Sequence, residues 1–224
     1  MRINADFSKR CLVHSARREW SRSPIAGVDR RMLDRVGHEV ARATSIVRYA
    51  AVSRFSPHVH GGGEEILVLD GVFQDEHGDF SAGSYLRNPP GTRHAPGSLT
   101  GCRIFVKLWQ FDAADRKQVR IDSRSAAGLT DPRRSGVVVV PLFRDAYEDV
   151  RLERWDAGAR VSMTVPGGAE ILVVEGSLTE QQDLLERESW LRVPAASSID
   201  ATAGLDGCLV WIKTGHLPVR ALQS

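Results

Sequence analysis

The sequence predicts an all-β chain that contains two copies of one supersecondary design. Short runs of β-branched and other apolar residues, such as 66–69 and 104–106, are bounded by glycine, proline or aspartate, as expected for strands between turns. The segment 62–71 is repeated at 167–176, at a constant offset of 105 residues. An internal repeat of this kind indicates two copies of one supersecondary unit. We therefore expect two tandem β-strand units of one design.

The first copy is predicted to consist of strands that follow one another between turns. Residues 11–14 are expected to form a strand that pairs with one of the barrels, and residues 43–50 are rich in β-branched side chains. The apolar run 66–69 predicts a buried strand, and Gly78 marks a hairpin turn. The alternating segment 102–110 is expected to close this copy.

These elements predict a first domain over residues 1–115 and a second domain over residues 136–224. Residues 116–135 are mostly polar and are predicted to form a linker between the two. Each domain is long enough to bury a hydrophobic core of its own.

The composition excludes several classes of function. With 42% hydrophobic and 26% charged residues, the chain resembles an ordinary soluble protein, and its net charge of +2 offers no electrostatic footprint for nucleic acid. No apolar segment has the length of a membrane helix, and the N-terminus lacks a signal-peptide core. Three cysteines are too few for a disulfide framework, which favours a reducing cytoplasm.

Four side chains in the first copy form a candidate metal site. His58 and His60 are two residues apart, so on an extended strand both imidazoles point to one face. Glu64 follows a run of three glycines, and His94 follows a Pro-Pro-Gly turn. Three imidazoles and one carboxylate suit zinc, iron, manganese or nickel. Glu65 is the alternative carboxylate, because neighbouring strand side chains point to opposite faces and only one of the two can reach the metal.

The residues around this site resemble the two cupin motifs. The first motif is matched by His58, His60, Glu64 and Gly71. The second is matched by Gly83, Pro89, Gly91 and His94, with Ser98 where that motif usually ends in asparagine. Cupins are small antiparallel jelly-roll barrels that hold a metal inside. The resemblance therefore implies two tandem cupin (double-stranded β-helix) barrels, a bicupin.

A narrower resemblance concerns the ChrR-type anti-sigma factors. Segments 62–69, 82–91 and 101–102 are similar to the cupin domain of that family. There the cupin domain binds zinc, and a separate N-terminal zinc-binding helical domain contacts the sigma factor. This sequence shows no Cys-x-x-Cys and no helical domain with paired cysteines, so the resemblance does not extend to anti-sigma activity.

The second copy is expected to hold no metal. The positions equivalent to the four candidate ligands are occupied by Met163, Val165, Ala169 and Ile199. These side chains are apolar or weakly coordinating, so we expect them to pack the interior instead. Glu170 matches Glu65, which favours a structural role for both.

Few other polar side chains are candidates for the site. Arg87 and Arg93 flank the second motif, where either surface ion pairs or an anionic substrate would account for them. Cys102 and Cys208 occupy equivalent positions, which favours a packing role. His216 has no evident partner in the sequence and is expected at the surface.

Two functions of different classes follow. The resemblance to ChrR favours a sensor or regulatory module that holds one divalent transition metal per chain, zinc first. Such a module would respond to a small-molecule ligand or an oxidant and act through a regulatory protein partner. The alternative is an iron- or manganese-dependent cupin dioxygenase that acts on a diketone-like or aromatic ketone substrate. In either case we expect no nucleic-acid or membrane partner. We also expect a homodimer, because exposed barrel edges tend to pair.

Overall fold

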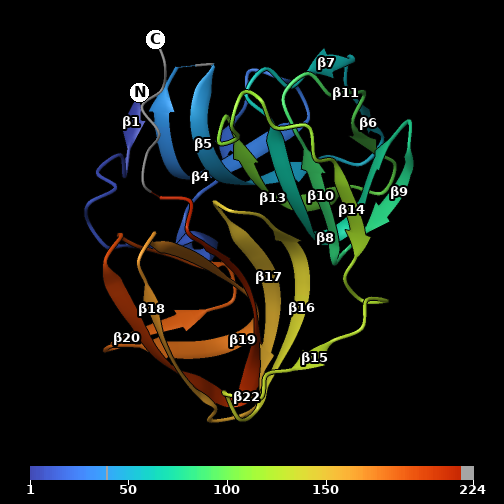
Figure 1. Cartoon of the computed structure of the whole chain (residues 1–224). Coiled ribbons are helices and arrows are strands. Elements are labelled where there is room, and N and C mark those ends of the chain that lie inside the picture. Colours follow the sequence, from blue (N-terminus) through green and yellow to red (C-terminus); the bar gives the residue numbers. More distant parts are fainter. Residues whose placement is uncertain (39, 218–224) are drawn as a thin grey trace. The chain divides into compact units, whose positions relative to one another are not determined.

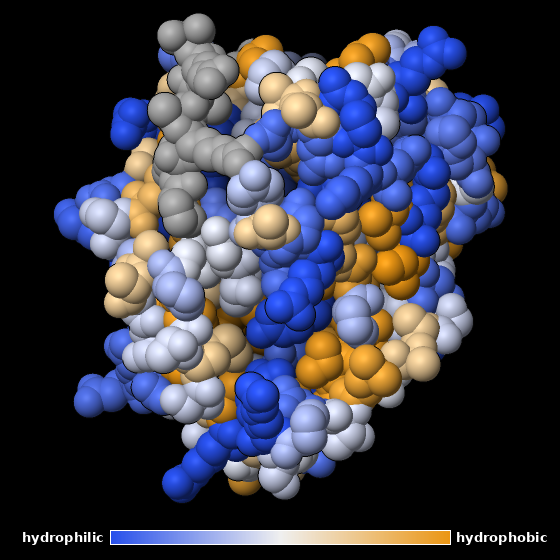
Figure 2. Space-filling model, viewed as in Figure 1, coloured by the Kyte–Doolittle hydropathy of each residue, from blue (hydrophilic) through white to orange (hydrophobic). Residues whose placement is uncertain are grey.

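A computed structural model of the chain describes residues 1–38 and 40–217. Its regular structure is β-strand, apart from one 3-10 turn, η1 (Ser15–Arg17), and these residues contain no α-helix (Figure 1). The all-β prediction is confirmed. The described part of the chain has no helix that is long and apolar enough to cross a membrane. Hydrophilic residues predominate on the face shown in Figure 2, and apolar residues form smaller patches between them.

The chain folds into two compact units whose boundaries differ from the predicted ones. The first unit comprises Met1–Ala5 and Arg18–Ala126, whereas Asp6–Arg17 belongs to the second unit, with the described residues from Ala127 onward. The reason lies in one strand pairing. Strand β2 (Cys11–His14) is the predicted strand, and it pairs antiparallel with β21 (Ser189–Val193) of the second unit.

The boundary between the two units, at Ala126 and Ala127, falls within the predicted linker, but this segment also contains regular structure. Strand β14 (Val119–Asp122) adds to the edge of β10 (Ser84–Asn88) in the first unit. Strand β15 (Leu129–Thr130) pairs with β16 (Val137–Arg144) in the second. Their polar, exposed side chains reflect edge positions with solvent on one side, which a polar sequence alone does not distinguish from a loop.

The first unit is organised around one sheet. Its main path runs in the order β1-β4-β5-β13-β8-β10-β14. The bounds are β1 (Arg2–Ile3), β4 (Val28–Gly37), β5 (Ala41–Tyr49), β8 (Glu64–Asp75) and β13 (Cys102–Leu108). Short strands at its margins are β3 (Ser21–Arg22), β6 (Ser53–Arg54), β9 (Gly78–Ser81) and β12 (Gly97–Ser98). A separate two-stranded sheet joins β7 (His58–Val59) to β11 (Arg93–His94).

The second unit has a sheet of closely similar order. Its main path is β15-β16-β17-β22-β19-β21-β2. The strands not yet given are β17 (Asp149–Trp155), β18 (Arg160–Val165), β19 (Ala169–Glu180), β20 (Asp183–Glu186) and β22 (Ser197–Thr214).

The sequence repeat corresponds to a repeat of backbone structure. Cys102 lies opposite Gly71 in the pair β13–β8, and Cys208 lies opposite Gly176 in the pair β22–β19. Both glycines have a φ of +69°, and a Cβ on either would lie 2.1 Å from a backbone oxygen. Glycine is therefore required at both positions, which explains why the repeat retains it.

Each unit has its own hydrophobic core on one face of its sheet. Ile66 and Ile104 are buried in the first core, and Ile171 and Ile212 in the second. Burial of each such side chain contributes roughly 1.5–3 kcal/mol. The predicted packing role of the cysteines is confirmed, because each belongs to one of these cores and burial raises the thiol pKa to about 11 and about 12, respectively.

Candidate metal centre

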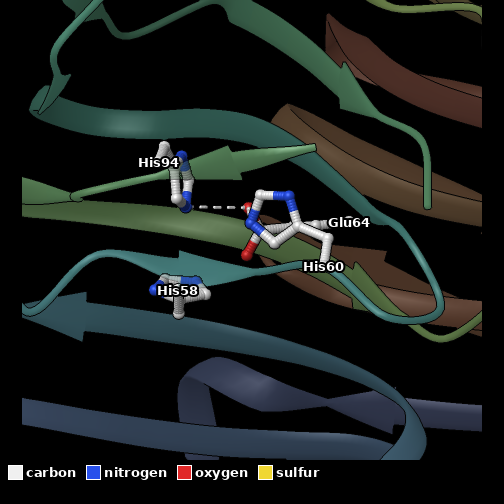
Figure 3. Close-up of side chains that lie close together, drawn as sticks. All are labelled: His58, His60, Glu64 and His94. Atoms are coloured by element: carbon white, nitrogen blue, oxygen red, sulfur yellow. Dashed lines mark ion pairs between the residues drawn. The ribbon is translucent and has the colours of Figure 1, made fainter. Parts of the chain in front are cut away.

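The structure brings together all four candidate ligands predicted from the sequence. His58 opens β7 and His94 closes β11, and the two are direct partners in that antiparallel pair. His60 follows β7, and Glu64 is the first residue of β8. Figure 3 shows the four side chains directed toward one another from these elements.

The four side chains are close enough to share one ion. One potential ligand atom from each of His58, His60, Glu64 and His94 lies within 4.8 Å of all the others. The Nε2 atoms of His60 and His94 lie 3.2 and 3.3 Å from the same oxygen, Oε2 of Glu64. Three of the residues are buried, whereas His58 is exposed, so the cluster is reached from the His58 side.

Neighbouring groups fix which nitrogen of each buried imidazole carries the proton. The Thr92 hydroxyl donates its only proton to the carbonyl of Pro89, at 2.7 Å. Its oxygen therefore accepts from Nδ1 of His60, at 2.9 Å. Asp75 can only accept, and its Oδ2 lies 3.3 Å from Nδ1 of His94. In both rings Nδ1 is thus the donor, and Nε2 presents a lone pair to the cluster.

The exposed imidazole of His58 also carries its proton on Nδ1. Its Nδ1 lies 3.3 Å from the backbone carbonyl of Ser56, which can only accept a hydrogen bond. The proton therefore sits on Nδ1, and Nε2 is available to a ligand on this ring as well. The three imidazoles are consequently held in one tautomer, the one needed for coordination through Nε2.

The surroundings move the pKa values of the two buried imidazoles in opposite directions. Burial lowers the pKa of His60, against the smaller raising effect of Glu64. Burial also acts to lower the pKa of His94, but the hydrogen bond to Asp75 and the charge of Glu64 outweigh it and raise the pKa. Glu64 and Asp75 therefore place negative charge on either side of His94, an arrangement that also favours a bound cation.

The arrangement fits a divalent transition metal. Nε2 of His60, Nε2 of His94 and Oε2 of Glu64 are all buried, and none has a hydrogen-bond partner of acceptable geometry. Leaving three buried polar atoms unsatisfied is costly, and such atoms are rare in folded proteins. A cation between them would satisfy all three at once. Nitrogen and carboxylate donors match the preferences of zinc, iron, manganese and nickel.

Sequence reasoning missed two residues that orient the ligands. Thr92 supports His60, and Asp75 supports His94. Thr92 lies within the second motif, two residues before His94, so its position was a usable signal. Asp75 lies 19 residues before His94 and reaches it where the end of β8 pairs with β12, Gln74 opposite Gly97. Nothing local in the sequence indicated that contact.

Glu65 is excluded from the cluster, as the strand alternation predicted. Its Oε1 accepts a 2.8 Å hydrogen bond from the hydroxyl of Tyr85 on the opposite face of the sheet. Glu170 repeats this arrangement and accepts from Nε1 of Trp190, at 3.0 Å. The surface position expected for His216 was wrong: its side chain is only 7% exposed and lies 2.9 Å from Oε1 of Glu170.

Neither arginine of the second motif contacts the cluster. Arg87 is 2% exposed and forms an ion pair of 2.6 Å with Asp115, so the expectation of a surface residue was wrong for it. Arg87 lies opposite Glu65 in the pair β10–β8, on the face that turns away from Glu64. Arg93 is exposed.

The equivalent positions of the second unit are packed with apolar side chains. Val165, Ala169 and Ile199 belong to the second hydrophobic core, and Met163 packs against it. Met163 and Ile199 are direct partners in the pair β18–β22, the same register as His58 and His94. The backbone of a metal site is thus repeated there without its donor atoms.

Solved structures of similar fold cover nearly the whole chain. A candidate dioxygenase from Nostoc punctiforme aligns over 96% of this chain and 85% of its own, with a TM-score of 0.77 and 17% identity. The bacterial pirin YhhW from Escherichia coli, in complex with nickel(II), aligns over 92% and 99%, with a TM-score of 0.63 and 16% identity. A cupin 2 conserved barrel domain protein from Leptotrichia buccalis aligns over 87% and 92%, with a TM-score of 0.59 and 11% identity.

At these identities the likeness establishes the fold alone, which is similar to that of a cupin 2 conserved barrel domain protein. The sequence comparison concerns the first part of the chain. Residues 8–112 match the family model of the ChrR cupin-like domain, so this segment resembles that domain, as its motifs predicted. No curated protein matches the sequence significantly.

Proposed function

We propose that the protein binds one divalent transition metal through His58, His60, Glu64 and His94. The observation that carries the proposal is the set of three buried, unsatisfied donor atoms that face one another in this cluster. The fixed tautomers of the imidazoles support it, because they direct lone pairs rather than protons toward the ion.

The second unit is proposed to be a cupin barrel without metal, which makes the chain a bicupin. The repeated strand registers and the glycine turns at Gly71 and Gly176 support this organisation. In this reading the second unit keeps the backbone of a cupin and has replaced donor atoms with core packing.

The metal centre is proposed to serve a sensor or regulatory role. The match to the ChrR cupin-like domain supports this role, with zinc as the first metal. The exposed His58 leaves the cluster open on one side, where a small ligand or an oxidant can reach it. A regulatory protein partner, and a homodimer as the working assembly, complete the proposal.

A dioxygenase is the second candidate. The fold similarity to the candidate dioxygenase from Nostoc punctiforme favours it. Iron or manganese bound at this site would supply O2-activating chemistry. The four side chains would hold the metal and leave the His58 side open to a diketone-like or aromatic ketone substrate, while Asp75 and Thr92 would keep the imidazoles in place.

Metal analysis of protein purified without a histidine tag tests the proposal, with His94→Ala as the variant. About one metal per chain, lost in the variant, supports the site. Zinc then supports the sensor, whereas iron or manganese together with O2 consumption on diketones supports the dioxygenase. About two metals per chain would contradict a metal-free second unit. No metal after reconstitution with zinc, iron, manganese and nickel would reject the central proposal.

A further inference from the structure

Two aromatic rings lie directly against the glycine loop that joins His60 to Glu64. A Cβ on Gly61 would lie 2.9 Å from the ring of Trp109, and a Cβ on Gly62 would lie 2.4 Å from the same ring. A Cβ on Gly63, whose φ is +80°, would lie 2.4 Å from the ring of Phe111. The loop therefore has room for backbone only, because the two rings occupy the space that side chains would need.

Trp109 reaches this position in an unfavourable backbone conformation. Its φ is +58°, in the left-handed region that a residue with a Cβ rarely adopts, and its side chain is 39% exposed. The equivalent residue of the second unit is Gly215, with a φ of +90°. The backbone hydrogen bond is the same in both units: Trp109 donates to the carbonyl of Gly63 at 3.1 Å, and Gly215 to that of Gly168 at 3.0 Å.

The second unit shows that the turn itself needs no tryptophan. There the same turn is made by glycine, which fits a left-handed φ without strain. Strain alone does not single out Trp109, because Val52 also has a φ of +56° where the second unit has Gly158. What distinguishes Trp109 is its ring, which lies on the loop between two candidate ligands. Strained residues that persist in this way cluster at functional sites.

The second ring at the loop, that of Phe111, is itself packed against a buried arginine. The guanidinium of Arg87 lies 4.4 Å from the centroid of the Phe111 ring. Arg87 is itself buried and fixed by a 2.6 Å ion pair with Asp115. The second unit has Leu217 in place of Phe111, against Gly168. Aromatic rings press on this loop only in the unit whose loop carries ligand residues, among the residues that the structure describes.

We propose that Trp109 is a positioning residue of the metal centre. Its indole, together with Phe111, holds the loop 61–63 against the sheet and so fixes the separation of His60 and Glu64. This inference rests on the proposed metal binding. The ring lies against Gly61 and Gly62, between the two ligand residues, so its effect is expected on the retention of the metal rather than on the identity of the metal.

Three variants test the role of the ring. Trp109→Gly removes the ring and also relieves the left-handed strain, so the variant is expected to fold. Trp109→Phe restores a smaller ring at the same position. Val52→Gly is the matched control, because it relieves equivalent strain at a site away from the loop.

The measurements are zinc release into excess chelator and amide hydrogen exchange of residues 61–64 in zinc-free protein. Trp109→Gly is expected to release zinc at least about 10-fold faster than wild type, as loss of a supporting group does at other metal sites. Its loop amides should exchange faster by a similar factor. Trp109→Phe should recover most of both losses, and Val52→Gly should behave as wild type.

The inference would be overturned if Trp109→Gly released zinc and exchanged its loop amides at the wild-type rates. It would also be overturned if Val52→Gly accelerated both processes as much as Trp109→Gly does. A wild-type protein that binds no zinc, iron, manganese or nickel would instead reject the proposed function. The exchange measurement would then still decide whether the ring holds the loop, so the two failures are distinguishable.

Discussion

His58 and His94 are direct partners across the antiparallel pair β7–β11. In the second unit, Met163 and Ile199 occupy the same relationship across β18–β22. One backbone design therefore carries two different interiors, a polar cluster in the first unit and a packed core in the second. The comparison gives each metal-site experiment an internal control at the equivalent position.

Alanine substitutions at the equivalent positions 94 and 199 should have opposite consequences. His94→Ala removes a donor and should abolish stoichiometric metal binding. Ile199→Ala should leave the metal content unchanged but destabilise the protein by about 2–5 kcal/mol, because Ile199 is fully buried in the second core. Elemental analysis and denaturant unfolding measure the two effects. Loss of metal in Ile199→Ala, from a folded protein, would contradict the separation of roles.

Asp75→Asn should weaken metal binding without removing a ligand. The amide of asparagine can donate a hydrogen bond to Nδ1 of His94, which would move the ring proton to Nε2 and block its lone pair. We expect about 10- to 100-fold weaker zinc binding, measured by competition with a chelator. Thr92→Val should act similarly through His60, because it removes the acceptor of the Nδ1 proton. Unchanged affinity in both variants would show that tautomer control is unimportant here.

The four cluster residues were predictable because their spacing follows local geometry. His58 and His60 alternate along one strand, and the glycine run allows the chain to turn before Glu64. Asp75 was not predictable, because its contact with His94 depends on the pairing of the end of β8 with β12. The same holds for His216, whose partner Glu170 lies on a different strand, 46 residues away.

The fold, too, was predictable where it depends on local sequence and not where it depends on pairing between distant segments. Alternation and turn residues predicted the strands, and the repeat predicted the equivalent units. The sequence did not predict which strand β2 pairs with. Its partner β21 lies about 180 residues further along the chain, and the sequence of a four-residue strand does not indicate its partner. Strands β14 and β15 were missed because short edge strands have polar, loop-like sequences.

Tyr85→Phe tests whether the neighbouring residues Glu64 and Glu65 have different roles. The variant removes one hydrogen bond from the buried carboxylate of Glu65, which should cost about 1–3 kcal/mol of stability. Metal content should not change, since Glu65 faces away from the cluster. Glu64→Gln is the matched comparison and should lose metal with a smaller effect on the stability of metal-free protein. Metal loss in folded Tyr85→Phe would mean that the face of Glu65 also supports the site.

A buried carboxylate stabilises the second unit through several partners. Glu153 is fully buried and accepts from Arg134 at 2.8 and 2.9 Å, from Arg151 at 2.6 Å and from Nε1 of Trp155 at 2.7 Å. Burial acts to raise the pKa of Glu153, but the hydrogen bonds and charges of the two arginines outweigh it and hold the pKa below its ordinary value of 4.5. The folded protein therefore favours the ionised form.

Glu153→Gln should destabilise the protein in a manner that depends on pH. Near neutral pH the variant removes the buried counter-charge of Arg134 and Arg151, which keep only the more exposed Asp131 and Asp149, and the loss should cost about 1.5–3 kcal/mol. Because the pKa is lowered on folding, the wild-type advantage is complete above about pH 4.5 and is lost as the pH falls through the folded value. Denaturant unfolding from about pH 7 down to about pH 3 should therefore show the two proteins converging at acid pH. A difference that stays constant over this range would mean that the glutamate acts through its shape rather than its charge.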